Sequence, residues 1–81
     1  MTENTPDRLL TEGEKAVGIT FNPSNNPVVD LINRKYADII DELDMLRAAA
    51  TSVGARRYYS KAISYTEDAQ MNAVKAVTWQ Y

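Results

Sequence analysis

The sequence contains no cysteine and no histidine, and these absences exclude several kinds of chemistry. Without cysteine there is neither a disulfide framework nor a thiolate metal site, and without histidine there is no imidazole base. Carboxylates alone could bind a metal ion, but the acidic residues lack the spacing of a calcium-binding loop. The sequence therefore indicates no metal site and no other cofactor.

Long apolar runs and an excess of basic charge are also missing. No apolar run approaches the ~20 residues that span a bilayer, and the N-terminus lacks the apolar stretch of a signal peptide. The net charge of -2 gives no general attraction to nucleic acid or to anionic membranes. The 81 residues form one domain at most, and such small chains often oligomerise. We expect a soluble intracellular protein, a single domain over residues 1–81, that binds neither DNA nor membranes.

Turn-forming residues are concentrated in one stretch, residues 19–26, which reads ITFNPSNN. Pro23 and the following Pro27 fix their own φ and disfavour a helical conformation in the preceding residue. Asn26 is a good N-cap, with Pro27 at the first helical position. A helix N-terminus also suits a phosphate, because it presents free N–H groups. The stretch is either a plain helix start or a corner that binds an anion and a base, and on its own it favours the plain start.

Residues 1–18, which precede this loop, are predicted to form an N-terminal arm and a short helix. The first six residues are polar and are expected to fray. A weak helical pattern covers Asp7–Val17, with Leu9 and Leu10 as its contacts to the rest of the protein. Gly13 weakens the pattern, and Gly18 is suited to end the helix in a left-handed conformation.

Two long helices are expected after the loop, over residues 27–52 and 55–79. Apolar and small residues recur in steps of four and three in both segments, which is a heptad seam. The first seam is Ile32, Tyr36, Ile39, Leu43, Leu46, Ala50 and Val53, and the second is Ala55, Tyr59, Ala62, Thr66, Ala69, Ala73 and Ala76. The break at residues 51–54 is short, so the helices should be antiparallel neighbours, each about 37 Å long. The predicted fold class is all-α: a short N-terminal helix followed by a long two-helix hairpin.

A hairpin of this kind leaves apolar side chains uncovered on both helices. The expected exposed flanks are Val29, Leu31, Ile40 and Met45 on the first helix, and Ile63, Met71, Val74, Val77 and Trp79 on the second. Exposed apolar patches usually mark partner surfaces. We therefore expect the hairpin to oligomerise into a helical bundle assembly. The acidic residues Asp38, Asp41, Glu42 and Asp44 are interpreted as a solvated stripe.

Some basic residues occupy positions that invite explanation. Arg56 and Arg57 fall in the first turn of the second long helix, where cations are unfavourable. An anionic partner or acidic groups of a neighbouring subunit would explain them equally well. Lys75 lies in an apolar stretch, one turn before Thr78. Its stem could simply extend to the surface, or the pair could hold a phosphate.

The loop and the closing helix together resemble a known family. Residues 18–24 follow the pattern G-x-T-F-N-P-S, residues 29–32 follow V-x-x-I, and residues 69–78 read AQMNAVKAVT. This combination resembles the phage anti-CBASS cyclic-nucleotide sponges, whose helical hairpin is shared with a class of anti-Thoeris sponges. The similarity covers about residues 18–78. One departure is Asn72, where the family usually has a tryptophan, and it bears on one packing contact or on ligand preference.

The resemblance implies a binding protein and not an enzyme. Members of this family sequester the cyclic oligonucleotide messengers of bacterial immune cyclases without cleaving them, in the cytoplasm of the infected host. They assemble as hexamers, trimers of dimers, with ligand sites between protomers. Dinucleotides of the cyclic GMP–AMP type occupy one class of pocket, and trinucleotides such as cyclic tri-adenylate occupy a second class near the three-fold axis.

The candidate ligand-binding residues are Phe21, Asn22, Pro23, Ser24, Arg34, Lys35, Lys75 and Thr78. Phe21 could stack on a base, while Asn22 and Ser24 could bond a base edge or a phosphate. Arg34 or Lys35 could lie over a base or reach a phosphate from another protomer. Lys75 and Thr78 are the candidates for the second pocket.

Two rival functions remain open at the level of sequence. The first is a structural helical hairpin whose apolar flanks mediate only protein–protein contacts. The second is a small DNA-binding regulator, which the acidic balance and the lack of a basic recognition helix disfavour.

Overall fold

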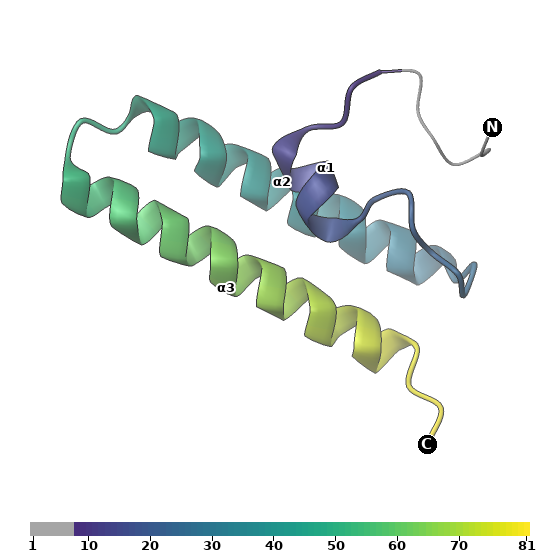
Figure 1. Cartoon of the computed structure of the whole chain (residues 1–81). Helices are drawn as coiled ribbons and strands as arrows, with labels where there is room; N and C mark the ends of the chain where they lie inside the picture. The colour runs from purple at the N-terminus through teal and green to yellow at the C-terminus, as the bar shows by residue number, and fades with distance from the viewer. Residues whose placement is uncertain (1–7) are drawn as a thin grey trace.

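This computed structural model describes residues 8–81, which contain three helices and no strand (Figure 1). The short helix α1 covers Glu12–Val17, and the long helices are α2, Pro27–Ala49, and α3, Val53–Val77. The expected all-α fold with a short helix before a long hairpin is thereby confirmed. The expected fraying of the first six residues, and a helix start at Asp7, lie outside the described range.

Helix α1 is shorter than expected because it begins at Glu12, where Thr11 caps it, while its other end falls at Val17 as expected. Thr11 accepts the Glu14 N–H at 3.1 Å, and the Glu14 carboxylate accepts the Thr11 N–H at 2.9 Å, which is a capping box. At the other end, Gly18 has φ 65°, and the N–H groups of Gly18 and Ile19 donate to the carbonyls of Lys15 and Glu14. This Schellman arrangement confirms Gly18 as the helix stop. Leu9, expected to pack on the hairpin, is 93% exposed.

Helix α1 lies directly against α2, through a glycine and a carboxylate. The Gly13 N–H donates to Asp41 Oδ1 at 2.7 Å, and the Thr11 hydroxyl donates to Asp41 Oδ2 at 2.8 Å. Asp41 therefore anchors α1, and the interpretation of this residue as part of a solvated acidic stripe is wrong.

The start of α2 has the predicted chemistry, with Asn26 accepting the Val28 N–H at 2.9 Å and Pro27 in the first turn.

The connection between α2 and α3 comes earlier in the chain than expected, because α3 begins at Val53 with Ser52 as its N-cap. Arg56 donates through Nε to the Ala50 carbonyl at 2.9 Å. This bond satisfies a carbonyl at the end of α2, so the placement of Arg56 needs no anionic partner.

The buried face of α2 is rotated away from the predicted seam. The buried residues are Val29, Asn33, Ala37 and Ile40, spaced at four and three, and two of these, Val29 and Ile40, were expected to be exposed. Ile39 and Leu46, expected in the seam, are 50% and 45% exposed. The reason is α1, which packs on α2 beside α3 and moves the centre of the core between the three helices. The core cluster is Val17, Ala37 and Ile40, with Ile63 of α3 packed against it.

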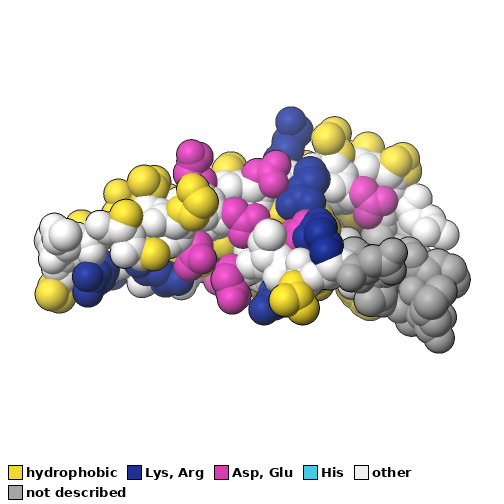
Figure 2. Space-filling view, turned by 90° about the horizontal axis from the view of Figure 1, so that it is seen from above, with side chains coloured by type: hydrophobic (Ala, Val, Ile, Leu, Met, Phe, Trp, Pro, Cys, Tyr) yellow, Lys and Arg dark blue, Asp and Glu magenta, His cyan; other side chains and the backbone are white. Residues whose placement is uncertain are grey.

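The α3 side of the hairpin departs from its predicted seam in the same way. Gln70 is buried, whereas Ala69 and Ala76 are exposed. Leu31, Met45, Met71 and Trp79 are exposed large hydrophobics, which confirms that part of the expected flanks. In Figure 2, hydrophobic side chains lie on both sides of a central band of charged side chains. Among the described residues, no helix has the length and apolarity to cross a membrane.

Candidate functional site

The loop of residues 19–26 forms a corner that is held by hydrogen bonds of its polar side chains. Asn22 donates through Nδ2 to the Asn26 carbonyl at 2.9 Å and to Asp30 Oδ1 at 3.0 Å. Ser24 donates to Asn22 Oδ1 at 2.7 Å and accepts the Asn26 N–H at 3.2 Å. Asn25 adopts φ 55°, a left-handed conformation that Asn tolerates. Asn22 and Ser24, two of the predicted ligand groups, are therefore largely engaged in shaping the loop.

A cavity of about 270 Å³ opens where this corner meets the three helices. Its lining residues are Val17, Phe21, Asn22, Pro23, Ser24, Val29, Asn33, Gln70, Val74 and Thr78. We refer to it as the corner cavity. It combines the end of α1, the start of α2 and the end of α3, because the antiparallel hairpin brings the last of these beside the loop (Figure 1).

The corner cavity has an exposed aromatic side chain and a hydroxyl among its lining groups. Phe21 is 73% exposed, so its ring is available to a ligand and is not buried as a packing residue. Thr78 donates its hydroxyl to the Val74 carbonyl at 2.8 Å, and its oxygen can still accept. The structure thus brings together Phe21, Asn22, Pro23 and Ser24 as predicted, and it adds Thr78 to this group.

Two amide side chains of the corner cavity were not among the predicted site residues. Asn33 and Gln70 are 2% and 6% exposed. Gln70 Nε2 donates to Asn33 Oδ1 at 2.8 Å and to the Val17 carbonyl at 3.3 Å, which joins all three helices. Spacing could have identified Asn33, because it lies four residues from both Val29 and Ala37 on a face that is otherwise apolar.

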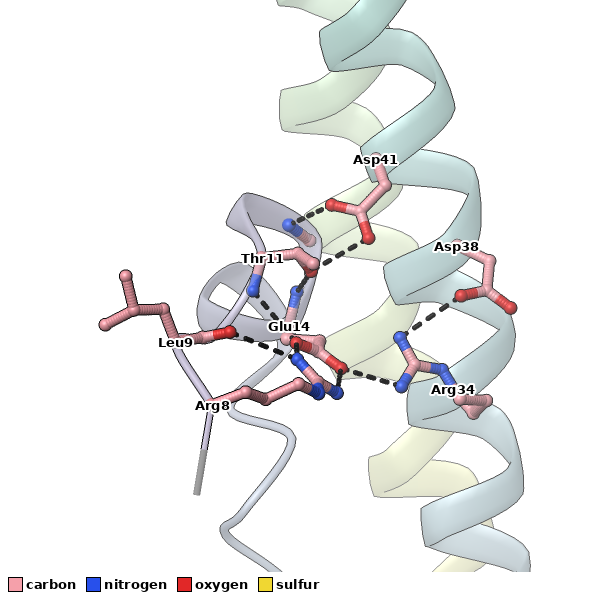
Figure 3. A network of polar contacts seen from close by, with 8 residues as sticks. Arg8, Leu9, Thr11, Glu14, Arg34, Asp38 and Asp41 are labelled. Atoms are coloured by element: carbon pink, nitrogen blue, oxygen red, sulfur yellow. Dashed lines mark hydrogen bonds and ion pairs between the residues drawn. The ribbon is translucent and has the colours of Figure 1, made fainter. Parts of the chain in front are cut away.

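Arg34 lies in a charge cluster outside the corner cavity (Figure 3). Its guanidinium contacts Glu14 Oε2 at 2.8 Å and Asp38 Oδ1 at 3.1 Å. Arg8 also donates to Glu14, at 2.6 Å from Nη1 to Oε1. The side chain of Glu14 is 2% exposed, so this carboxylate is a buried anion between two cations.

The contacts of Glu14 determine its ionisation. The hydrogen bond from Arg8, the backbone N–H of Thr11 and the hydrogen bond from Arg34 hold the pKa of Glu14 well below its usual range, against the opposing effect of burial. The Glu14 carboxylate raises the pKa of Arg34 in turn. The ion pair between Glu14 and Arg34 therefore fastens α1 to α2. Because Arg34 also pairs with Asp38, it is only partly available for a ligand.

The two predicted lysines lie apart from the corner cavity. Lys35 is exposed on α2. Lys75 has its Nζ 5.9 Å from the centre of the Trp79 ring and lines a separate shallow depression with Asn72, Ala76 and Trp79. Lys75 and Thr78 were predicted to share one pocket. In the structure they line different cavities, because Thr78 lines the corner cavity.

No group of three acidic residues that could hold a metal ion occurs within residues 8–81. Comparison with known proteins identified no matching family model, no matching curated protein and no matching solved structure.

Proposed function

We propose that this protein binds cyclic oligonucleotide messengers and sequesters them without cleavage, as a phage anti-defence sponge against bacterial CBASS immunity. The observation that carries the proposal is the corner cavity, in which an exposed Phe21 ring stands beside apolar walls and two buried amides. Base–aromatic stacking contributes about 1–3 kcal/mol per base, and amides bond base edges. A nucleobase needs these two kinds of contact.

The size of the corner cavity fits one base better than a whole ligand. Its volume of about 270 Å³ is below the ~300–1,000 Å³ of pockets that enclose a drug-sized molecule. A cyclic dinucleotide has a second base and two phosphates, which must contact another surface. A second protomer supplies that surface, in agreement with ligand sites between the subunits of a hexamer.

Exposed apolar side chains support the assembly part of the proposal. Leu31, Met45 and Trp79 are 54%, 69% and 57% exposed. Apolar surface of this kind is typical of an interface. Lys75, which lies over Trp79, is the candidate for a phosphate of cyclic tri-adenylate in the second class of pocket, in the cytoplasm of the infected host.

The same exposed side chains favour a second candidate function, a structural hairpin that oligomerises and binds no nucleotide. Light scattering and thermal unfolding separate the two candidates. Both give a particle mass well above the 9.1 kDa of one chain. Only the sponge gains stability from cyclic GMP–AMP, by about 2.7 kcal/mol at a ligand concentration 100 times Kd. A monomer in solution contradicts both.

A further inference from the structure

The orientation of the two buried amides in the corner cavity is fixed by the backbone. The Val17 carbonyl can only accept a hydrogen bond, so the nitrogen of Gln70 must face it. The second N–H of Gln70 then points to Asn33, which must present its oxygen. The pair therefore has one arrangement, in which the remaining groups are Gln70 Oε1 and Asn33 Nδ2.

These two remaining groups form no hydrogen bond within residues 8–81. Both belong to side chains that are more than nine-tenths buried and that line the corner cavity. Neither atom is itself fully buried, since Arg34 Nε is the one fully buried side-chain nitrogen or oxygen without a partner among the described residues. Both atoms therefore reach the surface of the corner cavity, where water or a ligand can bond them. A vacant acceptor beside a vacant donor, among the apolar walls of Val29 and Val74, matches a ligand edge with the opposite pattern.

We propose that Gln70 and Asn33 read the edge of a nucleobase that enters the corner cavity, with Gln70 Oε1 accepting from an exocyclic amine and Asn33 Nδ2 donating to a ring nitrogen. The inference rests on the proposed function and adds a specificity to it. Adenine presents N6–H beside N7 on its Hoogsteen edge, whereas guanine presents two acceptors there. For a base that presents this edge, the amide pair therefore favours adenine over guanine, and Phe21 supplies the stacking surface.

The test compares two ligands that differ only in the group that Gln70 would contact. Calorimetry is carried out with cyclic di-adenylate and with its analogue in which unsubstituted purine replaces both adenines. The analogue keeps the ring faces, the ring nitrogens and the phosphates, but it lacks the exocyclic amine. The wild type should bind the analogue roughly tenfold more weakly, because one hydrogen bond is lost and an acceptor stays unpaired.

Two glutamine variants assign the effect to Gln70. The variant Gln70→Met should bind the two ligands within about twofold of each other. Gln80→Met is the matched control, because Gln80 is exposed and does not line the corner cavity, and it should keep the tenfold preference. If Q70M does not fold, the comparison of the two ligands on the wild type still decides whether the exocyclic amine is recognised, and equal binding overturns the inference.

The possible outcomes separate this inference from the function on which it rests. Equal binding of both ligands by the wild type, or an unchanged preference in folded Q70M, overturns the reading by the amide pair and leaves the sponge function intact. Absence of binding to cyclic di-adenylate, cyclic GMP–AMP and cyclic tri-adenylate alike overturns the sponge function and this inference with it.

Discussion

Gly13 of α1 lies so close to Ala37 of α2 that a Cβ at residue 13 would be 2.1 Å from the Ala37 carbonyl oxygen. The same Cβ would be 2.8 Å from Asp41 Oδ1, the atom that accepts the Gly13 N–H. Since the obstructing atoms include backbone, they cannot move aside as a flexible side chain could. The absence of a side chain at residue 13 is therefore what allows α1 to dock.

We predict that Gly13→Ala lowers the free energy of unfolding by about 1–3 kcal/mol, the usual cost of an overpacked contact. Gly54→Ala is the matched control, because its Cβ would meet only Ser52 Oγ at 3.6 Å, an ordinary contact. Gly54→Ala should be neutral or stabilise by up to about 1 kcal/mol. Thermal unfolding measures both, and a G13A variant as stable as G54A contradicts the close approach.

Glu14 should make stability depend on acid pH. Its folded-state pKa lies below the ordinary value of 4.5, so its contribution is complete above about pH 4.5 and is lost as the pH falls toward the folded-state pKa. Glu14→Gln should be less stable than wild type at pH 7 and should lose less stability on acidification.

Glu12→Gln serves as the control for this prediction. Glu12 is an exposed carboxylate of the same helix, 3.8 Å from Lys15, and its replacement should change stability by less than about 0.5 kcal/mol. Urea unfolding between pH 7 and pH 3 provides the measurement. Parallel pH profiles of wild type and E14Q would show that the cluster does not fasten α1 in the way proposed.

The parts of the fold that the sequence predicts well are those determined by local chemistry. The caps at Asn26 and Gly18 each depend on residues a few positions away, and both are found as expected. The buried face of α2 depends on where α1 docks, and that docking depends on a glycine whose only apparent meaning in the sequence is a weaker helix. The predicted seam of α2 is wrong for this reason.

The candidate site was predictable to a similar extent. The loop residues cluster as expected because they are neighbours in the chain. Thr78 joins them only because the hairpin returns α3 to the start of α2. Gln70 was missed since a single glutamine on a helix gives no indication of burial until its partner Asn33, 37 residues away, is known.

Phe21→Ala should weaken cyclic GMP–AMP binding by about 1–3 kcal/mol with the fold intact, because the ring is exposed and available for stacking. Tyr65→Ala is the control, since Tyr65 is a comparably exposed aromatic residue, at 68%, on α3 and outside the corner cavity. Titration of both variants measures the effect. An F21A protein that folds, assembles and binds as tightly as Y65A removes Phe21 from the site.

Lys75→Ala should weaken binding of cyclic tri-adenylate by about 1.5–3 kcal/mol, the contribution of a charge-assisted hydrogen bond. Binding of cyclic GMP–AMP should stay nearly unchanged, and Thr78→Val should instead act on that ligand. Lys61→Ala is a close control, because Lys61 lies over the Tyr58 ring at 5.6 Å much as Lys75 lies over Trp79 at 5.9 Å. Equal loss of both ligands in K75A would mean that the two pockets are one site.

The sponge function is tested most directly by calorimetry of the purified wild-type protein with cyclic GMP–AMP and with cyclic tri-adenylate, followed by heat denaturation and chromatography of the released ligand. Binding of at least one of these messengers, with the ligand recovered intact, is the predicted result. Failure to bind either, or recovery of a cleaved product, would contradict sequestration.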